Sequence, residues 1–149
     1  MEMKVLGIDE IVYGADDFDA CRGFFGDWGL TIKRDDAQGL DFETLNGCRV
    51  LVRRVADPAL PPAIEDGPTL REVVWGVDDE ASLAAVRSRI ADEPTFVSLE
   101  DGARIGCTDP NGLAVRFQVS RKHAVEVECA LMNTWNEKPR MNQRSPIYE

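Results

Sequence analysis

Two stretches of the chain carry the same pattern of apolar and polar positions. Residues 8–17 read Ile-Asp-Glu-Ile-Val-Tyr-Gly-Ala-Asp-Asp, and residues 70–79 read Leu-Arg-Glu-Val-Val-Trp-Gly-Val-Asp-Asp. A second pair, residues 46–52 and 111–117, begins with Asn-Gly in both copies and follows at nearly the same offset. Such a repeat is typical of two copies of one supersecondary unit. Because one copy alone would bury too little surface, we expect the two to share a core.

The first copy is predicted to form a strand, a helix and three further strands. Its helix begins after Asp16-Asp17, whose carboxylates suit the free N–H groups of a first turn, and ends at Gly29. Asn46-Gly47 is a strong hairpin signal between the last two strands. The expected strands are residues 5–14, 30–34, 41–45 and 48–53, and the apolar stripe of the helix is Phe18, Cys21, Phe25 and Trp28.

The second copy repeats this order. Asp78-Asp79 precedes a helix with Leu83, Val86 and Ile90 on one face. Its expected strands are residues 70–77, 95–99, 103–108 and 113–119. The predicted fold class is therefore α+β, with two tandem β-α-β-β-β modules at residues 1–55 and 69–120.

Two regions lie outside the repeat. Residues 56–68 contain four prolines and are predicted to link the modules. Residues 121–149 lose the pattern and are interpreted as a C-terminal tail or an interdomain linker, in which residues 123–132 could add one strand. Beyond Asn133 we expect mobility, or order only against a neighbouring chain.

The net charge of the chain restricts the classes of molecule that it is expected to bind. The chain has 17 Lys and Arg against 27 Asp and Glu, a formal charge of -10, so its net field repels polyanions. We therefore expect neither a nucleic-acid nor a membrane partner, and no apolar run has the length of a membrane span or signal peptide. The four cysteines form no Cys-x-x-Cys pair and are expected to be reduced thiols of a cytoplasmic protein.

The repeat and its turns resemble the vicinal oxygen chelate superfamily, which includes glyoxalase I, bleomycin resistance proteins and type I extradiol dioxygenases. The resemblance covers residues 4–120 and rests on residues 7–12, the Asp16-Asp17-Phe18 helix start and the turn at residues 109–112 with the strand after it. It implies that the two modules form an open cup with helices outside, and that a small aromatic or polar molecule sits in the cup.

Residues 67–75 look most like the N-terminal half of extradiol-dioxygenase-like proteins, and residues 144–149 look like the linker that leads to their second domain. That resemblance implies a truncated form or a stand-alone homologue. It also implies no cofactor in this chain, with Fe(II) or another divalent metal in a missing C-terminal domain. The partner would be that domain or a second copy in a homo-oligomer, such as a dimer.

The family places metal ligands at four equivalent strand positions, which map here to Glu10, Glu72, Leu51 and Arg116. The last two depart from the pattern, since Leu51 cannot coordinate a metal and Arg116 is a permanent cation. We therefore expect no stoichiometric iron, zinc or manganese, with Glu10 and Glu72 as weak candidate ligands.

Strand alternation predicts which side chains share the cup. If Ile11 and Tyr13 pack under the helix, Glu10 faces the other side, and Glu72 does the same in the second copy. Arg116 is then expected between these two carboxylates, where a metal stands in catalytic relatives. The residues predicted to line the cup are Glu10, Glu72, Arg116, Arg49, Arg53 and Gln118.

This cluster has three interpretations: a divalent metal site that lacks its other ligands, a structural ion network, or binding groups for a small polar aromatic. His123 lies past the last repeated strand and is not expected to be a ligand. The aromatic side chains are expected to fill the core between sheet and helices; they are Tyr13, Phe24, Phe25, Trp28 and Trp75.

Three functions follow from these interpretations. The first is a metal-free, non-catalytic half of a protein of aromatic-compound catabolism, which supports a second domain or an oligomer. The second is a divalent-metal-dependent dioxygenase or lyase that uses Glu10 and Glu72. The third is a resistance-type protein that binds a small aromatic molecule.

Overall fold

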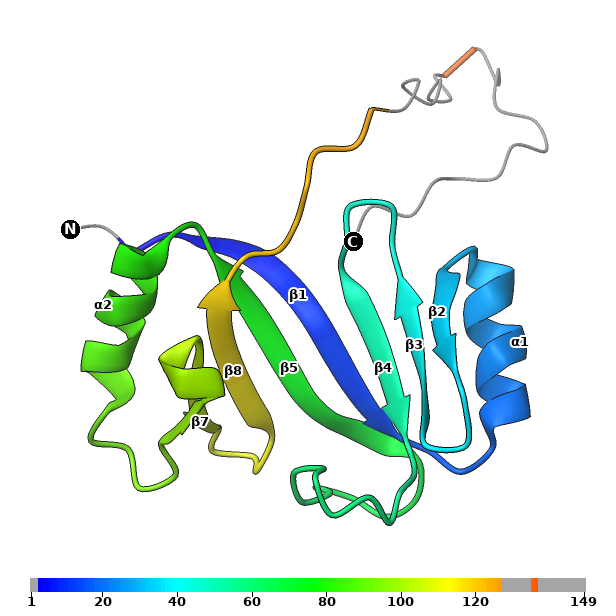
Figure 1. The fold of residues 1–149 in the computed structure, drawn as a ribbon, viewed down its shortest axis with the longest axis horizontal. Helices are drawn as coiled ribbons and strands as arrows, with labels where there is room; N and C mark the ends of the chain where they lie inside the picture. Colours follow the sequence, from blue (N-terminus) through cyan, green and yellow to red (C-terminus); the bar gives the residue numbers. More distant parts are fainter. Residues whose placement is uncertain (1–2, 127–134, 137–149) are drawn as a thin grey trace.

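The computed structural model describes residues 3–126 and 135–136 and shows two β-α-β-β-β modules joined into one sheet (Figure 1). The first module contains β1 (Val5–Gly14), α1 (Phe18–Trp28), β2 (Thr31–Asp35), β3 (Gly39–Glu43) and β4 (Arg49–Arg53). The second contains β5 (Thr69–Val77), α2 (Glu80–Ile90), β6 (Val97–Leu99), the short 3-10 turn η1 (Glu100–Gly102), β7 (Arg104–Thr108) and β8 (Ala114–Val119). The predicted α+β class and the module order are confirmed.

The eight strands follow the order β2-β3-β4-β1-β5-β8-β7-β6. The modules meet where β1 pairs antiparallel with β5, and each of these strands pairs parallel with the last strand of its own module. Figure 1 shows α1 at one end of the row of strands and α2 at the other end. One face of the sheet carries the helices, and the other is the inner face of the cup.

Local chemistry sets the ends of the helices as the sequence indicates. Asp17 caps α1 by accepting a hydrogen bond from the Ala20 amide at 2.9 Å, and Asp79 accepts one from the Ser82 amide at 2.7 Å. Gly29 ends α1 in the left-handed region, with φ of 93°, where glycine carries no steric cost. These caps fix where each helix leaves the sheet.

Each helix packs over its own module. Phe18 of α1 is buried against Phe42, Val50 and Val52 of the sheet. Ile11 and Tyr13 pack against this cluster, as predicted. Leu83 and Val86 of α2 pack on Val77 and Ile105. Most of the five aromatic residues are expected in the core, and two of them are not there, because Phe24 is 54% exposed and Trp28 is 58% exposed.

The strand predictions are right in number and differ slightly in their ends. The strand expected at residues 95–99 begins later, as β6, because the chain before it still turns and the Phe96 amide donates to the Glu93 carbonyl at 2.9 Å. The segment between β4 and β5 is tied to the sheet, since Arg71 donates hydrogen bonds to the carbonyls of Val55 and Pro61. Neither α1 nor α2 is long and apolar enough to cross a membrane, and they are the only α-helices in the described ranges.

Residues 121–126 form no strand, so the extra strand considered at residues 123–132 is absent from its described part. The remainder of that segment, and nearly all of the tail beyond Asn133, lie outside the described residues. The chain leaving β8 crosses to the first module, where the His123 amide donates to the Asn46 carbonyl at 3.0 Å. This contact joins the modules a second time.

Candidate functional site: the charged floor of the cup

Glu10 is the most deeply buried carboxylate on the inner face of the cup. Its residue is 2% exposed and lies at the centre of the sheet, on β1. The parallel register places Arg49 of β4 directly beside it, and the two side chains form an ion pair. On its other side, Arg104 Nη1 donates to Glu10 Oε1 at 3.2 Å. Glu10 is thus held between two guanidinium groups.

Arg104 of β7 connects the two modules on this face. Its guanidinium donates to Glu10 in the first module and, through Nη2, to Gln118 Oε1 of β8 at 2.9 Å. The Nη1 atom also lies 3.8 Å from Glu72 Oε1, and Nε lies 3.5 Å from Glu100 Oε1. Arg104 therefore stands between Glu10 and Glu72, the position that the sequence analysis gave to Arg116.

Arg116 contacts Glu72 alone among these carboxylates, so its expected place between Glu10 and Glu72 is wrong. Its Nε lies 3.2 Å from Glu72 Oε2 without the geometry of a hydrogen bond, and its Nη1 donates to the Cys107 carbonyl at 3.0 Å. Gly106 of β7 leaves room for this side chain, because a Cβ there would lie 2.7 Å from Arg116 Cδ. Because Gly106 has no side chain, the Arg116 side chain can lie along β7, away from Glu10.

Gln118 continues the network toward the end of β8. Its Nε2 donates to Asp9 Oδ2 at 3.2 Å, and Asp9 also accepts from Ser120 Oγ and the Arg121 amide, each at 2.9 Å. Strict alternation along β1 does not predict Asp9 in this network, because it places Asp9 on the face opposite Glu10. A register shift between Ile8 and Glu10 breaks that alternation, and both neighbouring acids become buried.

Arg53 shares the inner face but not the network. It lies at the other end of β4, where its Nη1 pairs with Asp41 Oδ1 at 2.6 Å and donates to the Leu40 carbonyl at 3.2 Å. Of the six residues predicted to line the cup, Glu10, Glu72, Arg49, Arg116 and Gln118 belong to one connected cluster. Arg104 is the member that the sequence analysis missed.

Glu72 is the least satisfied group of the cluster. It is buried, and no group in the described part of the chain donates a hydrogen bond to its carboxylate. Burial raises the pKa of Glu72 above its ordinary value, the Arg116 and Arg104 charges oppose the rise, and the Glu10 and Glu100 carboxylates add to it. Glu72 therefore holds a proton more readily in the folded chain than in the unfolded one.

The arrangement does not fit a divalent metal. Within residues 3–126 and 135–136, no three His, Cys, Asp or Glu side chains come together as a metal site would require. Leu51 is buried on β4 as an apolar residue. An ion between Glu10 and Glu72 would also meet the guanidinium of Arg104, a permanent cation in the same space.

Known proteins match this chain in their three-dimensional structure. No family model and no curated protein sequence matches the chain. The Mn(II)-bound glyoxalase from Novosphingobium aromaticivorans matches its structure with a TM-score of 0.57 at 24% identity, over 85% of this chain and 43% of that one. A catechol 2,3-dioxygenase matches with a TM-score of 0.62 at 15% identity, over 80% of this chain and 40% of that one.

A complex of homoprotocatechuate 2,3-dioxygenase from Brevibacterium fuscum with 3,4-dihydroxyphenylacetate matches equally well. Its TM-score is 0.62 at 13% identity, over 82% of this chain and 39% of that one. The chain has the vicinal oxygen chelate fold. It spans less than half the length of each of these three proteins.

Within the vicinal oxygen chelate fold, the two modules of this chain are not equivalent at the cup. Arg104 pairs with Gln118 across β7 and β8, while Gly39 pairs with Arg53 across β3 and β4. A Cβ at Gly39 would lie 2.6 Å from Arg53 Nη1, so Arg53 fills this space in the first module. The second module instead sends Arg104 to the centre of the cup.

Replacing Arg104 by Met should destabilise the chain in a pH-dependent way. Removing one partner of a buried ion pair costs roughly 3–5 kcal/mol of unfolding free energy. The pKa of Glu72 should rise further, because an attractive charge is lost. The native state then binds protons in preference to the unfolded state, so the loss is largest at neutral pH and shrinks as pH falls through the folded pKa of Glu72 toward its ordinary value.

Urea unfolding at about pH 5.5 and about pH 7.5 measures this effect. Adding Glu72→Gln to the Arg104→Met variant should abolish the extra pH dependence, because the titrating carboxyl is gone. The control is Arg22→Met, which removes an exposed arginine paired with Asp35 and should change stability little. A loss below about 0.5 kcal/mol for Arg104→Met at both pH values would place Arg104 in solvent instead.

Proposed function

We propose that this chain is a metal-free, non-catalytic half of a glyoxalase- or extradiol-dioxygenase-like protein of aromatic-compound catabolism. Its role is structural, to support a second domain or a second copy of itself. We further propose that it acts in the cytoplasm, in line with Cys21 and Cys107, which remain free thiols.

One observation carries this proposal: the Arg104 guanidinium lies between Glu10 and Glu72. Arg104, together with Arg49 and Arg116, balances the charge of both carboxylates without an exchangeable ion. A divalent metal would have to displace Arg104 and would still lie near Arg49 and Arg116. A buried network of this kind can specify one geometry of the cup, even where it adds little net stability.

The lengths of the similar proteins support the proposed structural role. The three similar proteins are more than twice as long as the part of them that this chain matches. The glyoxalase among them is described with bound Mn(II), and the dioxygenases are named for ring cleavage. We propose that any such chemistry requires residues outside this chain, in a second domain.

The purified chain should bind no stoichiometric metal after incubation with Mn(II) and dialysis. The Arg104→Ala variant should gain only weak Mn(II) affinity by isothermal titration calorimetry, because Glu10 and Glu72 lose the guanidinium between them but stay paired with Arg49 and Arg116. Arg53→Ala is the matched control, since it removes another cation of the same face, away from both carboxylates. One tightly bound Mn(II) per wild-type chain would contradict the proposal and favour a metal-dependent dioxygenase or lyase that uses Glu10 and Glu72.

A second candidate function is the binding of a small polar aromatic molecule in the cup. A cavity of about 290 Å³ opens beside Glu72 and Arg116, under the prolines at positions 61 and 62. The Glu72 carboxylate accepts no hydrogen bond, and the buried Arg116 Nε donates none, within the described residues. Because Arg116 Nε is fully buried against Glu72, the Glu72 carboxylate is the group left as an acceptor for a ligand hydroxyl group or for water.

Catechol is a suitable probe, because its hydroxyl groups can donate to the Glu72 carboxylate. Under this second function it should bind the wild-type chain, and Glu72→Gln should weaken binding about tenfold, since a hydrogen bond to a charged group contributes roughly 1.5–3 kcal/mol. Glu43→Gln is the matched control on the same face, where Glu43 pairs with Lys33. Equal affinities of the wild-type and Glu72→Gln chains in calorimetry would exclude Glu72 as the binding group.

A further inference from the structure

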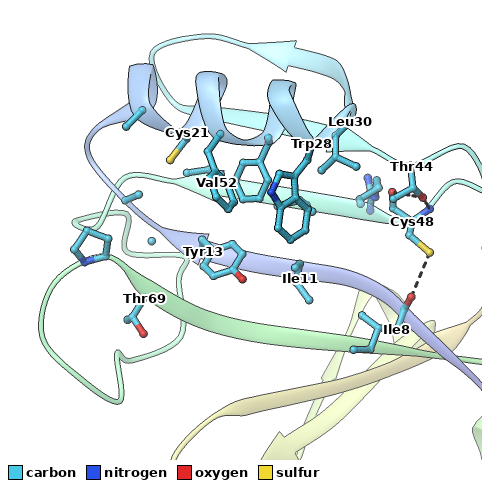
Figure 2. Close-up of a pocket in the computed structure, with 18 of the residues that line it drawn as sticks. Ile8, Ile11, Tyr13, Cys21, Trp28, Leu30, Thr44, Cys48, Val52 and Thr69 are labelled. Atoms are coloured by element: carbon cyan, nitrogen blue, oxygen red, sulfur yellow. Dashed lines mark hydrogen bonds between the residues drawn. The ribbon is translucent and has the colours of Figure 1, made fainter. Parts of the chain in front are cut away.

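A large hollow lies on the helix-bearing face of the sheet, opposite the cup. Its volume is about 850 Å³, and side chains from α1, β1 and β5 surround it (Figure 2). Figure 2 shows the Trp28 ring projecting from α1 toward β1, above Ile11 and beside Tyr13. Trp75 of β5 also lines the hollow, so both modules contribute to it.

The hollow exists because α1 covers only part of its module. The helix packs on β3, where the Phe25 and Phe42 rings lie 5.0 Å apart. The same face of β1 and β5 is left open, and Ile8 on β1 remains 39% exposed. At one end the Cys48 Sγ hydrogen-bonds to the Ile8 carbonyl at 3.3 Å (Figure 2), which ties the β4 side of the hollow to its floor.

The walls are aromatic and aliphatic. Phe24 and Trp28 of α1 contact each other with their rings tilted by 38° and the ring centroids 5.2 Å apart, and both residues stay more than half exposed beside the hollow. Among the described residues, Arg49 is the only charged one that lines the hollow, and its guanidinium is paired with Glu10. The Tyr13 hydroxyl makes no hydrogen bond within the described part of the chain and is a polar group available to orient a ligand.

We propose that this hollow is a binding site for a neutral aromatic or polycyclic small molecule. Its volume lies in the range of roughly 300–1,000 Å³ of small-molecule sites, and such sites combine apolar walls with a few polar groups. The charge of the lining suits a neutral ligand, because none of the described residues that line the hollow offers an unpaired cation to hold an anion. The site is separate from the cup and does not depend on the function proposed for it.

The occupant fits a small molecule better than a second copy of the chain. The aromatic residues lie around a concave space, which residues of α1 line together with residues of β1 and β5. The test separates these two occupants.

The neutral fluorophore N-phenyl-1-naphthylamine serves as the ligand probe. The experiment uses the Trp135→Phe chain, in which two tryptophans remain and both, Trp28 and Trp75, line the hollow. Binding should be saturable at one probe per chain and should quench tryptophan emission by energy transfer. Ile8→Glu places a charge on the floor of the hollow and should weaken binding by about tenfold or more.

Ile32→Glu is the matched control, because Ile32 is 43% exposed on β2 and lies outside the hollow. It should bind the probe like the parent chain, and circular dichroism should show that both variants are folded. Non-saturable binding, or equal affinities for Ile8→Glu and Ile32→Glu, would overturn the proposal. It would also be overturned if sedimentation showed a dimer that excludes the probe and that Ile8→Glu dissociates.

Discussion

Arg104 is the group on which the inner face of the cup depends. It donates to Glu10 in the first module and to Gln118 in the second, and it lies near Glu72. The β1–β5 pairing brings Glu10 and Glu72 to neighbouring strands of one sheet, where two buried carboxylates repel. A guanidinium between them turns this repulsion into a link between the modules. The buried charges on the inner face of the cup are thereby paired within the protein itself.

The two modules have the same order of elements, but they differ in their side chains on both faces of the sheet. On the inner face, the repeat is broken where the first module has Gly39 and the second has Arg104. On the helix-bearing face, α2 packs closely on its strands, while α1 leaves an aromatic hollow over β1 and β5. One sheet therefore presents a polar, internally neutralised surface on one side and an open apolar surface on the other.

The sequence predicted the fold well, because the repeated strand pattern and the Asp and Gly caps act locally. Alternation along β1 and β5 correctly placed Glu10 and Glu72 on one face. It failed at Asp9, where a register shift buries two successive acids. Arg104 was missed because it lies outside the repeated segments, and its reach to Glu10 depends on how four strands are arranged side by side. Exposure of Phe24 and Trp28 depends on how α1 sits on the sheet, which helical periodicity does not specify.

Double-mutant cycles on the unfolding free energy test the central position of Arg104 most directly. One cycle combines Arg104→Met with Glu10→Gln, and the other combines Arg116→Met with Glu10→Gln. The account predicts a favourable coupling of roughly 0.5–3 kcal/mol between Arg104 and Glu10, because their side chains are in contact, and a coupling near zero between Arg116 and Glu10. A coupling of Arg116 to Glu10 that equals or exceeds that of Arg104 would contradict it.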